Sequence, residues 1–309
     1  MKKAVIICGP TASGKTNFAH QFALRHGGEI INADSMQIYR QIPIITASPT
    51  LELKEELPYY LYNFIDASEE FSVAKYIEHA SNIIKQVSNR GALPIIVGGS
   101  GMYISMLING VSNIPNIEES VRVNARLLHQ KIGAYEFFNK LHIADPQVAS
   151  VLNMGDTQRV IRAYEVFMQT GKSIMHFQQQ KILPLPDINF RVILLLPIRK
   201  FLYDTCNNRL AQLFKTGAIE EVKTLFEQYP DLATSSSKAL GIAEIILYLK
   251  DEITKDKALE LASAKTRQYA KRQCTWFNNQ ITDKQVLQFG SINEYEQLIK
   301  SFNDQVIPA

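Results

Sequence analysis

The chain has 309 residues, of which 46% are hydrophobic and 20% charged, so a disordered or fibrous protein is excluded and a sizeable core is expected. The net charge is only +3, which excludes a general affinity for polyanions and requires that any contact with nucleic acid come from a local patch. The three cysteines lie far apart without a C-x-x-C pair, and no stretch approaches the roughly 18 apolar residues of a membrane-spanning helix, so we expect a cytoplasmic protein without zinc or disulfides.

The N-terminal part of the chain alternates strand and helix patterns. The apolar run AVIIC at 4–8 predicts a buried strand, and residues 13–27 predict the helix that follows it. Further strands are expected at 29–34 and at 92–99. The segment 73–89 that precedes the last of these strands has the spacing of an amphipathic helix.

The C-terminal part continues this alternation. Residues 189–197 predict a fourth strand, and helices are expected at 203–215, 219–227, 239–249 and 255–278, followed by a short strand (QVLQF) and a closing helix. Strands that alternate with helices predict an α/β fold, here a P-loop NTPase-like parallel sheet flanked by helices.

Strand patterns disappear between Pro115 and Pro186, where the sequence is helical and polar and is bounded by proline breaks. We therefore expect an inserted all-helical domain at 116–186, within a catalytic core formed by 1–115 and 187–309.

The octapeptide GPTASGKT, which follows the first strand, has the pattern G-x-x-x-x-G-K-[ST] of a phosphate-binding loop. In such a loop backbone N–H groups turn toward phosphate oxygens, a lysine adds a positive charge and a hydroxyl binds Mg²⁺. We expect Thr16 to be the magnesium ligand. The predicted phosphate-binding residues are Gly9, Pro10, Thr11, Ala12, Ser13, Gly14, Lys15 and Thr16.

Two further polar features follow strands of the predicted sheet. Asp34 comes at the end of the second strand, where an acidic residue can act as a general base or bind magnesium, but it can equally cap a helix starting at Met36. Ser100 lies in the loop GGSG after the third strand, a pattern that by itself is typical of a plain turn. In a parallel sheet both residues fall on the same edge as the phosphate loop.

A basic segment rich in aromatic residues lies at 261–280. On a helix, Lys265, Gln268, Arg272 and Trp276 share one side, a combination suited to phosphate contacts and base stacking. The alternative is a solvated basic face with the aromatic residues in the core. The pair Arg159 and Arg162, in the expected insertion, allows the same two interpretations.

These motifs occur together and in one order: GPTASGKT, INADSMQIYR, PIIVGGSGMYI, GDTQRVIRAYEVFMQTGKSI and TRQYAKRQCTWF. In this order they resemble the tRNA dimethylallyltransferases, from the first strand to about residue 280. The resemblance implies transfer of a dimethylallyl group from its diphosphate to N6 of adenosine 37 in tRNA, with Mg²⁺ bound and diphosphate released. The target adenine must leave its stack to react.

The resemblance also assigns roles to residues. It implies that Asp34 is the general base, that the Ser100 hydroxyl lies near the reacting groups, and that Arg209 stabilises the charge growing on the diphosphate. The insertion would contact the anticodon stem of the tRNA, and the protein is expected to be a monomer. The residues expected to contact tRNA are Asp34, Ser35, Met36, Gln37, Ser100, Arg122, Gln158, Arg159, Val160, Ile161, Arg162, Lys238, Gly241, Lys271, Arg272, Gln273, Trp276 and Phe277.

The chain departs from the usual motifs of this family at several positions. Ser48, in the segment that begins at Ile45, replaces a lysine, and Thr205 stands where many members have an arginine. Ile242 and Ala243 replace an aromatic and often a basic residue, and the KRQ motif ends in Asn278 instead of arginine. Each change removes a group that faces phosphate, so weaker binding of the substrate or the tRNA is expected.

Other functions are compatible with a phosphate loop alone. They are an ATP-dependent small-molecule phosphotransferase, a prenyltransferase acting on a free adenine nucleotide, and a noncatalytic RNA-binding protein. The insertion and the KRQCTWF segment favour a macromolecular acceptor over the two small-molecule enzymes. The presence of Asp34, Ser100 and Arg209 together favours catalysis over binding alone.

Overall fold

The computed structural model describes residues 2–303. The chain divides into two compact units, one formed by residues 1–108 and 185–309 and the other by Asn109–Pro184. The second unit therefore begins earlier than the expected 116. The reason is a two-stranded antiparallel sheet of β5 (Val111–Ser112) and β6 (Lys181–Ile182), which pairs the two connections of this unit. The expectation that no strand occurs between Pro115 and Pro186 was wrong at β6.

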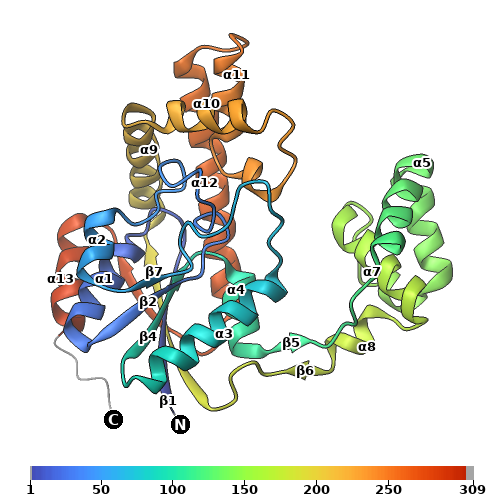
Figure 1. Ribbon diagram of the computed structural model, residues 1–309, viewed down its shortest axis with the longest axis horizontal. Coiled ribbons are helices and arrows are strands. Elements are labelled where there is room, and N and C mark those ends of the chain that lie inside the picture. Colours follow the sequence, from blue (N-terminus) through green and yellow to red (C-terminus); the bar gives the residue numbers. More distant parts are fainter. Residues whose placement is uncertain (1, 304–309) are drawn as a thin grey trace. The chain divides into compact units, whose positions relative to one another are not determined.

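A parallel sheet forms the centre of the first unit (Figure 1). Within the described residues it has six strands in the order β3-β2-β4-β1-β7-β8, and every neighbouring pair is parallel. This arrangement confirms the predicted α/β fold. The strands are β1 (Lys2–Cys8), β2 (Gly28–Asn32), β3 (Tyr59–Tyr60), β4 (Leu93–Gly98), β7 (Ile188–Pro197) and β8 (Gln285–Phe289).

Helices follow most strands, as the alternating pattern predicts. Sequence patterns missed the short helix α2 and the edge strand β3, which are too brief to show a period. The helices of the first unit are α1 (Lys15–His26), α2 (Leu51–Glu56), α3 (Val73–Asn89), α4 (Gly101–Asn109), α9 (Arg199–Lys215), α10 (Ala218–Gln228), α11 (Ile242–Leu249), α12 (Lys255–Gln280) and α13 (Ile292–Asn303), with a 3₁₀ turn at Ser235–Lys238. Among residues 2–303 no helix has both the length and the hydropathy needed to cross a membrane.

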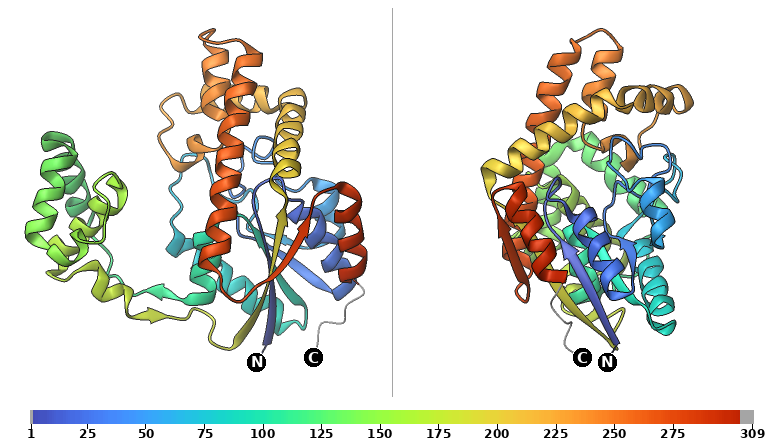
Figure 2. Two further views of the ribbon diagram at one scale, coloured as in Figure 1. Left: turned by 180° about the vertical axis from the view of Figure 1, so that it is seen from behind. Right: turned by 90° about the vertical axis from the view of Figure 1, so that its left-hand side faces the viewer.

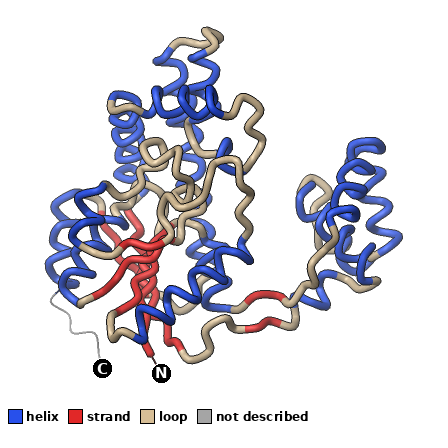
Figure 3. The backbone as a smooth tube through the Cα atoms, in the orientation of Figure 1, coloured by secondary structure: helices blue, strands red, loops and turns tan. Residues whose placement is uncertain are grey.

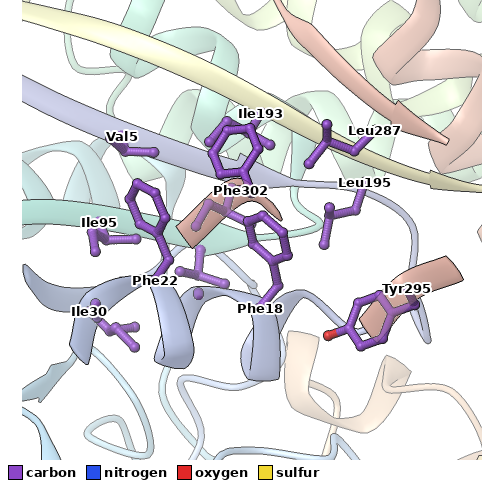
Figure 4. Packing of buried hydrophobic residues seen from close by; sticks show 14 of the residues in the cluster. Val5, Phe18, Phe22, Ile30, Ile95, Ile193, Leu195, Leu287, Tyr295 and Phe302 are labelled. Atoms are coloured by element: carbon purple, nitrogen blue, oxygen red, sulfur yellow. The ribbon is translucent and has the colours of Figure 1, made fainter. Parts of the chain in front are cut away.

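One face of the sheet is covered by α1 and α13 (Figures 1 and 4). Because side chains alternate along a strand, Val5 and Ile7 of β1 point to this face, where they join Phe18 and Phe22 of α1 and Phe302 of α13 in one buried cluster. The ring of Phe22 lies 5.9 Å from that of Phe302, centroid to centroid. The C-terminal helix is thus part of the core that holds α1 against the sheet.

The opposite face of the sheet is covered by α3 and α4 (Figure 1). Tyr76 of α3 and Tyr103 of α4 are both buried, and their rings stack with centroids 3.8 Å apart. This contact fixes α4, the helix that begins at Gly101, the last residue of the glycine loop 98–101.

A further helical layer, formed by α9, α10, α11 and α12, continues the first unit. Figure 2 shows α12 as a long helix that runs from α11 down beside the sheet. A second buried cluster joins Leu210 of α9, Val222 of α10, Ile242 of α11 and Ala262 of α12 with Ile38 from the segment after β2. This packing places α9 and α12 next to the loops that follow the strands.

The second unit is helical apart from the short antiparallel pair β5 and β6 (Figure 3). Its longest helix bends at Gly133, which has a φ of 79°. Phe137, Leu141, Val160 and Val166 form its separate hydrophobic core. Its helices are α5 (Glu119–Ala144), α6 (Pro146–Ala149), α7 (Thr157–Thr170) and α8 (Ile174–Gln178).

Replacing Phe22 with alanine should lower the free energy of unfolding by about 3–5 kcal/mol, because a ring 1% exposed leaves a cavity between α1, α13 and the sheet. Leu24 lies on the same helix and is 47% exposed, so Leu24→Ala should change this free energy by less than about 0.5 kcal/mol. Urea unfolding of both variants tests the prediction, and equal losses would contradict this account of the core.

Candidate active site

The loops that follow β1, β2 and β4 meet at one edge of the sheet. The Ser100 N–H donates to the Ala33 carbonyl at 3.1 Å, and the Ser35 N–H donates to Ser100 Oγ at 2.9 Å. The Thr11 N–H donates to Oε1 of Gln273 on α12 at 2.7 Å. Residues distant in sequence are therefore joined by direct hydrogen bonds where parallel strands end.

The phosphate loop (residues 9–16) leads into α1, and its residues Ala12 and Gly14 have the left-handed backbone conformation with positive φ. Gly14 has a φ of 80°, and Ala12 has a φ of 62°. Lys15 Nζ donates to the carbonyl of Pro10 at 2.6 Å, which closes the loop on itself. Removal from water lowers the pKa of Lys15 to about 8, although the Asp34 carboxylate opposes this shift.

This loop lines a cavity of about 570 Å³, here called the phosphate cavity. Residues 11–17 form one wall, and Asp34, Thr46 and Arg209 come from other segments. Gly9 and Pro10 are buried and lie outside this lining. Gly9 has no room for a side chain, since a Cβ there would be 2.4 Å from the Leu195 carbonyl oxygen.

Arg209 extends from α9 to the phosphate loop, where its guanidinium donates to the Thr11 hydroxyl. Loss of hydration lowers the pKa of Arg209, and the neighbouring Asp34 carboxylate counteracts the shift. Lys15 and Arg209 thus place two cationic side chains on the wall of the phosphate cavity. A multiply charged anion fits this surface.

Asp34 borders the phosphate cavity with a carboxylate that is partly engaged in a turn. Its Oδ1 accepts from the Met36 N–H at 2.9 Å, while its own N–H donates to Asn32 Oδ1 at 2.8 Å. Turns follow Asp34 instead of the helix expected at Met36, so the capping interpretation was wrong about the helix. It was right that the Asp34 side chain accepts from a nearby backbone N–H, here that of Met36. Within residues 2–303 the other carboxylate oxygen, Oδ2, has no hydrogen-bond donor, and the Asp34 side chain borders the phosphate cavity.

Ser100 connects the glycine loop to the segment after β2. Its hydroxyl accepts from the Ser35 N–H and donates to Ser35 Oγ at 3.1 Å. The side chain lines a different cavity from the one that contains the phosphate loop. The structure therefore places Ser100 beside Ser35, one step further from the phosphate loop than Asp34.

Three cavities of the first unit follow one another. The phosphate cavity shares Thr11, Asp34, Thr46 and Arg209 with a middle cavity of about 310 Å³. The middle cavity shares four other residues with an aromatic cavity of about 420 Å³. These four are Ser35, Met36, Tyr269 and Arg272. Asp34 thus lies where the phosphate cavity meets the middle cavity, and Ser35 lies where the middle cavity meets the aromatic cavity.

Aromatic rings from four segments of the chain line the aromatic cavity. The Trp276 ring packs so closely on the Gly101 backbone that a Cβ at Gly101 would be 2.3 Å from it. The Arg272 guanidinium lies 5.8 Å from the centroid of the Tyr269 ring. A planar apolar group fits such a lining, with a cation at its border. The rings belong to Tyr39, Phe71, Tyr103, Tyr269, Trp276 and Phe277.

The outer side of α12 carries a shallow groove of about 560 Å³, here called the helix groove. It contains Gln268, Arg272 and Trp276, as expected from helical spacing, and Lys271 as well. Lys265, placed on this side by the same argument, instead forms an ion pair with the buried Glu244 of α11.

Several residues expected to contact tRNA are inside the protein. Phe277 is fully buried and forms the inner wall of the aromatic cavity, and Val160 is part of the core of the second unit. Gln273 is 6% exposed and uses both ends of its amide internally, since Nε2 donates to the Gly99 carbonyl at 2.9 Å. Gly241 is also buried, at a φ of 96° that starts α11. Helical spacing alone did not separate these inward positions from the outward ones.

The other expected tRNA contacts are at least partly accessible. In the second unit Arg122, Arg159 and Arg162 each pair with an acidic residue three positions away. The partners of Arg122 and Arg159 are accessible, as in a solvated helix face, whereas Arg162 pairs with the buried Glu165. Gln158 and Lys238 are exposed, whereas Ile161 is half-buried. Gln37 donates to the carbonyls of Thr46 and Ala47 and lines the phosphate cavity.

The structure shows where the residues that depart from the family motifs lie. Ser48 accepts from Asn63 Nδ2 at 3.2 Å, and the Thr205 hydroxyl donates to the Phe201 carbonyl while its side chain lines the phosphate cavity. Ile45 lines the middle cavity. Ile242 is buried, and Ala243 and Asn278 are exposed.

Glu221 supports the segment that completes the phosphate cavity, a role that motif spacing did not reveal. Its two carboxylate oxygens accept from the N–H groups of Ile44 and Ile45, both at 2.7 Å. Loss of hydration raises the pKa of this carboxyl, while the two N–H donors oppose the shift. The bonds fix the backbone immediately before Thr46 and Ala47, which line the cavity.

Comparison with known proteins identifies the family of this chain. The model of a family described as IPP transferase matches residues 37–280. A tRNA dimethylallyltransferase of Rickettsia massiliae (strain Mtu5) is 52% identical over 300 residues, which cover 97% of this chain and 83% of the relative. The one from Rickettsia typhi (strain ATCC VR-144 / Wilmington) is 50% identical over 301 residues, covering 97% of each. The chain belongs to the IPP transferase family.

Solved structures agree with this assignment. The full-length tRNA isopentenylpyrophosphate transferase from Bacillus halodurans is 32% identical with a TM-score of 0.72, over 98% of this chain and 95% of that one. A eukaryotic dimethylallyltransferase acting on tRNA is 27% identical with a TM-score of 0.86, over 98% of this chain and 77% of that one. The resemblance seen in the sequence motifs is confirmed, and the fold is that of IPP transferases.

Replacing Gln273 with leucine should weaken the binding of inorganic diphosphate about tenfold. The change leaves the Thr11 N–H and the Gly99 carbonyl without their partner, and a buried unpaired polar group costs about 1–3 kcal/mol. Titration calorimetry measures the affinity. Gln268→Leu, on the exposed side of the same helix, is the control and should bind diphosphate as the unchanged protein does. Equal affinities for all three proteins would contradict the role given to Gln273.

Proposed function

We propose that this chain transfers a dimethylallyl group from dimethylallyl diphosphate to N6 of adenosine 37 in tRNA and releases diphosphate. The observation that carries the proposal is the position of Asp34, on the wall between a cavity suited to phosphates and the hollows that lead to a cavity suited to a planar base. The names of its relatives, tRNA dimethylallyltransferases at about half identity, support the same reaction.

The diphosphate of the donor would lie in the phosphate cavity. Backbone N–H groups of the phosphate loop, the Lys15 ammonium and the Arg209 guanidinium would contact its oxygens. When the bond between the allylic carbon and the bridging oxygen breaks, the electron pair leaves with the diphosphate. Fixed cations and N–H groups stabilise this growing negative charge and lower the barrier.

Asp34 would act as the general base. The adenine N6 attacks the allylic carbon and forms the new C–N bond, and the N6 proton passes to the carboxylate oxygen that Met36 does not engage. The dimethylallyl group would lie in the middle cavity, whose lining includes Ile45, Leu210 and Leu213. Ser100 would hold Ser35 in place and border the adenine from the aromatic cavity.

The residues of the phosphate cavity fit a magnesium ion bound together with the substrate. Mg²⁺ prefers oxygen ligands and commonly uses few protein groups plus substrate phosphates. The Thr16 hydroxyl and the Asp34 carboxylate are oxygen donors on this wall, and we propose Thr16 as the ligand. When bound, the ion would neutralise part of the charge on the leaving diphosphate.

The tRNA would reach the site over the helix groove. Lys271 and Arg272 would contact phosphates, and Trp276 would stack on a base next to the aromatic cavity. We propose further contacts through Arg122 and the segment 158–162 of the second unit. Val160 can contribute there only through its backbone, since its side chain is buried. The cytoplasmic location and the monomeric state stay predictions.

Incubation with labelled dimethylallyl diphosphate, Mg²⁺ and unmodified tRNA tests the reaction, and label should appear at adenosine 37. Asp34→Asn should reduce the rate at least about 10²-fold, because the base that accepts the N6 proton is lost. Asp231→Asn, at an exposed position, is the control and should keep full activity. Absence of label from the unchanged protein, together with ATP turnover, would contradict the proposed function. A normal rate for Asp34→Asn would show that Asp34 is not the general base and serves only to stabilise the turn before Met36.

Replacing Lys271 with alanine should weaken tRNA binding uniformly and reduce the slope of log affinity against log salt by about one, as expected when one phosphate contact is lost. The matched control is Lys257→Ala on the same helix, where the lysine pairs with Glu260 outside the helix groove. Filter binding at several salt concentrations measures both slopes. Identical slopes for the two variants would show that tRNA does not lie in the helix groove.

A further inference from the structure

Tyr295 links the C-terminal helix α13 to the start of the phosphate-binding helix. Its hydroxyl donates to the Gly14 carbonyl at 2.8 Å, and Asn17 Nδ2 donates to the same hydroxyl at 3.4 Å. Figure 4 shows the Tyr295 side chain beside the N-terminal end of α1. A residue near the end of the chain thus contacts the last glycine of the phosphate loop directly.

The fit between the two residues is close and buried. Gly14 has a φ of 80°, and a Cβ there would be 2.8 Å from the Tyr295 ring, so glycine is needed both for the backbone turn and for the contact. Tyr295 is 7% exposed, and its ring centroid lies 5.2 Å from that of Phe289 on the edge strand β8. Burial raises the pKa of the hydroxyl, which therefore remains protonated and able to donate.

The bond to the Gly14 carbonyl has a consequence for the neighbouring N–H. A peptide unit is planar and trans, so the Gly14 carbonyl and the Lys15 N–H point in opposite directions from one rigid plane. The carbonyl also accepts the Phe18 N–H at 3.1 Å, the first hydrogen bond of α1. Two donors on this oxygen fix the plane and with it the direction of the N–H of Lys15, a residue that lines the phosphate cavity.

A second residue of the same helix reaches the site. Ile292, at the first position of α13, lines the phosphate cavity together with Lys15 and Arg209. The family match ends at residue 280, so both contacts come from a part of the chain outside it.

We propose that Tyr295 is a positioning residue for the phosphate loop, which holds the Gly14–Lys15 peptide in the orientation that binds the donor diphosphate. The proposal rests on the proposed function in that the diphosphate is taken to be that of the allylic donor. The proposal predicts that loss of the Tyr295 hydroxyl weakens binding of the donor diphosphate and leaves binding of tRNA unchanged.

Tyr295→Phe removes the hydroxyl and keeps the ring. We expect the KM for dimethylallyl diphosphate to rise about three- to tenfold, the usual effect of losing the short hydrogen bond to the Gly14 carbonyl, and the affinity for inorganic diphosphate to fall by the same factor. The KM for tRNA should not change. The control is Tyr60→Phe on the edge strand β3. The Tyr60 hydroxyl donates to Glu29 of β2 at 2.7 Å and accepts from Arg90 at 3.1 Å, so this change likewise removes one donated and one accepted hydrogen bond, and it should leave both KM values unchanged.

Hydrogen exchange of residues 14–18 gives a readout independent of turnover. The amide protons of this segment should exchange faster in Tyr295→Phe than in the unchanged protein, while those of β1 and β4 stay protected. Unchanged diphosphate affinity and unchanged exchange would overturn the proposal, as would an equal loss of diphosphate and tRNA affinity. If the unchanged protein binds diphosphate but transfers no label to tRNA, the proposed function fails, whereas the binding and exchange measurements still test Tyr295.

Discussion

The whole site depends on the buried amide of Gln273. Its oxygen accepts from the Thr11 N–H of the phosphate loop, and its nitrogen donates to the Gly99 carbonyl of the glycine loop. One side chain of α12 therefore sets the separation of two loops that belong to adjacent strands, β1 and β4. The same helix carries Arg272 and Trp276 on its other side, so the surface proposed to receive tRNA and the loop proposed to hold the donor are parts of one rigid arrangement.

Charge at the centre of the site is balanced between one carboxylate and two cations. Asp34 stabilises the charged forms of Lys15 and Arg209, whose hydration is reduced by their surroundings. The same cations make it possible for a carboxylate to stand beside a bound diphosphate, since they offset the repulsion between the two anions. In the proposed reaction a proton moves to Asp34 while negative charge moves onto the diphosphate. The Lys15 and Arg209 cations would therefore interact less with a neutralised Asp34 and more with the departing diphosphate.

Sequence patterns predicted the sheet, the phosphate loop and the outward side of α12, because these features depend on local periodicity and on a motif with a fixed conformation. Gln273 and Phe277 were expected to contact tRNA, yet both are buried. The period of a helix shows which residues share a side, but in a segment with so few apolar residues it does not show which side is covered. Glu221 and Tyr295 were missed for a different reason. Each acts on a backbone more than a hundred residues away, and no local pattern records such a contact.

In the proposed reaction, the departures of this chain from the motifs of its family would give the backbone of the phosphate loop a larger share of the diphosphate binding. Within residues 2–303 the basic side chains on the wall of the phosphate cavity are Lys15 and Arg209, and Thr205 stands there with its hydroxyl bonded to Phe201. Ser48 is bonded to Asn63 and adds no cation. When fewer cations face a diphosphate, the N–H groups supply more of the electrostatic stabilisation. How much they supply depends on whether they already point toward the diphosphate oxygens before the ligand binds. A tyrosine that fixes the Gly14–Lys15 peptide is therefore most useful in a site of this composition.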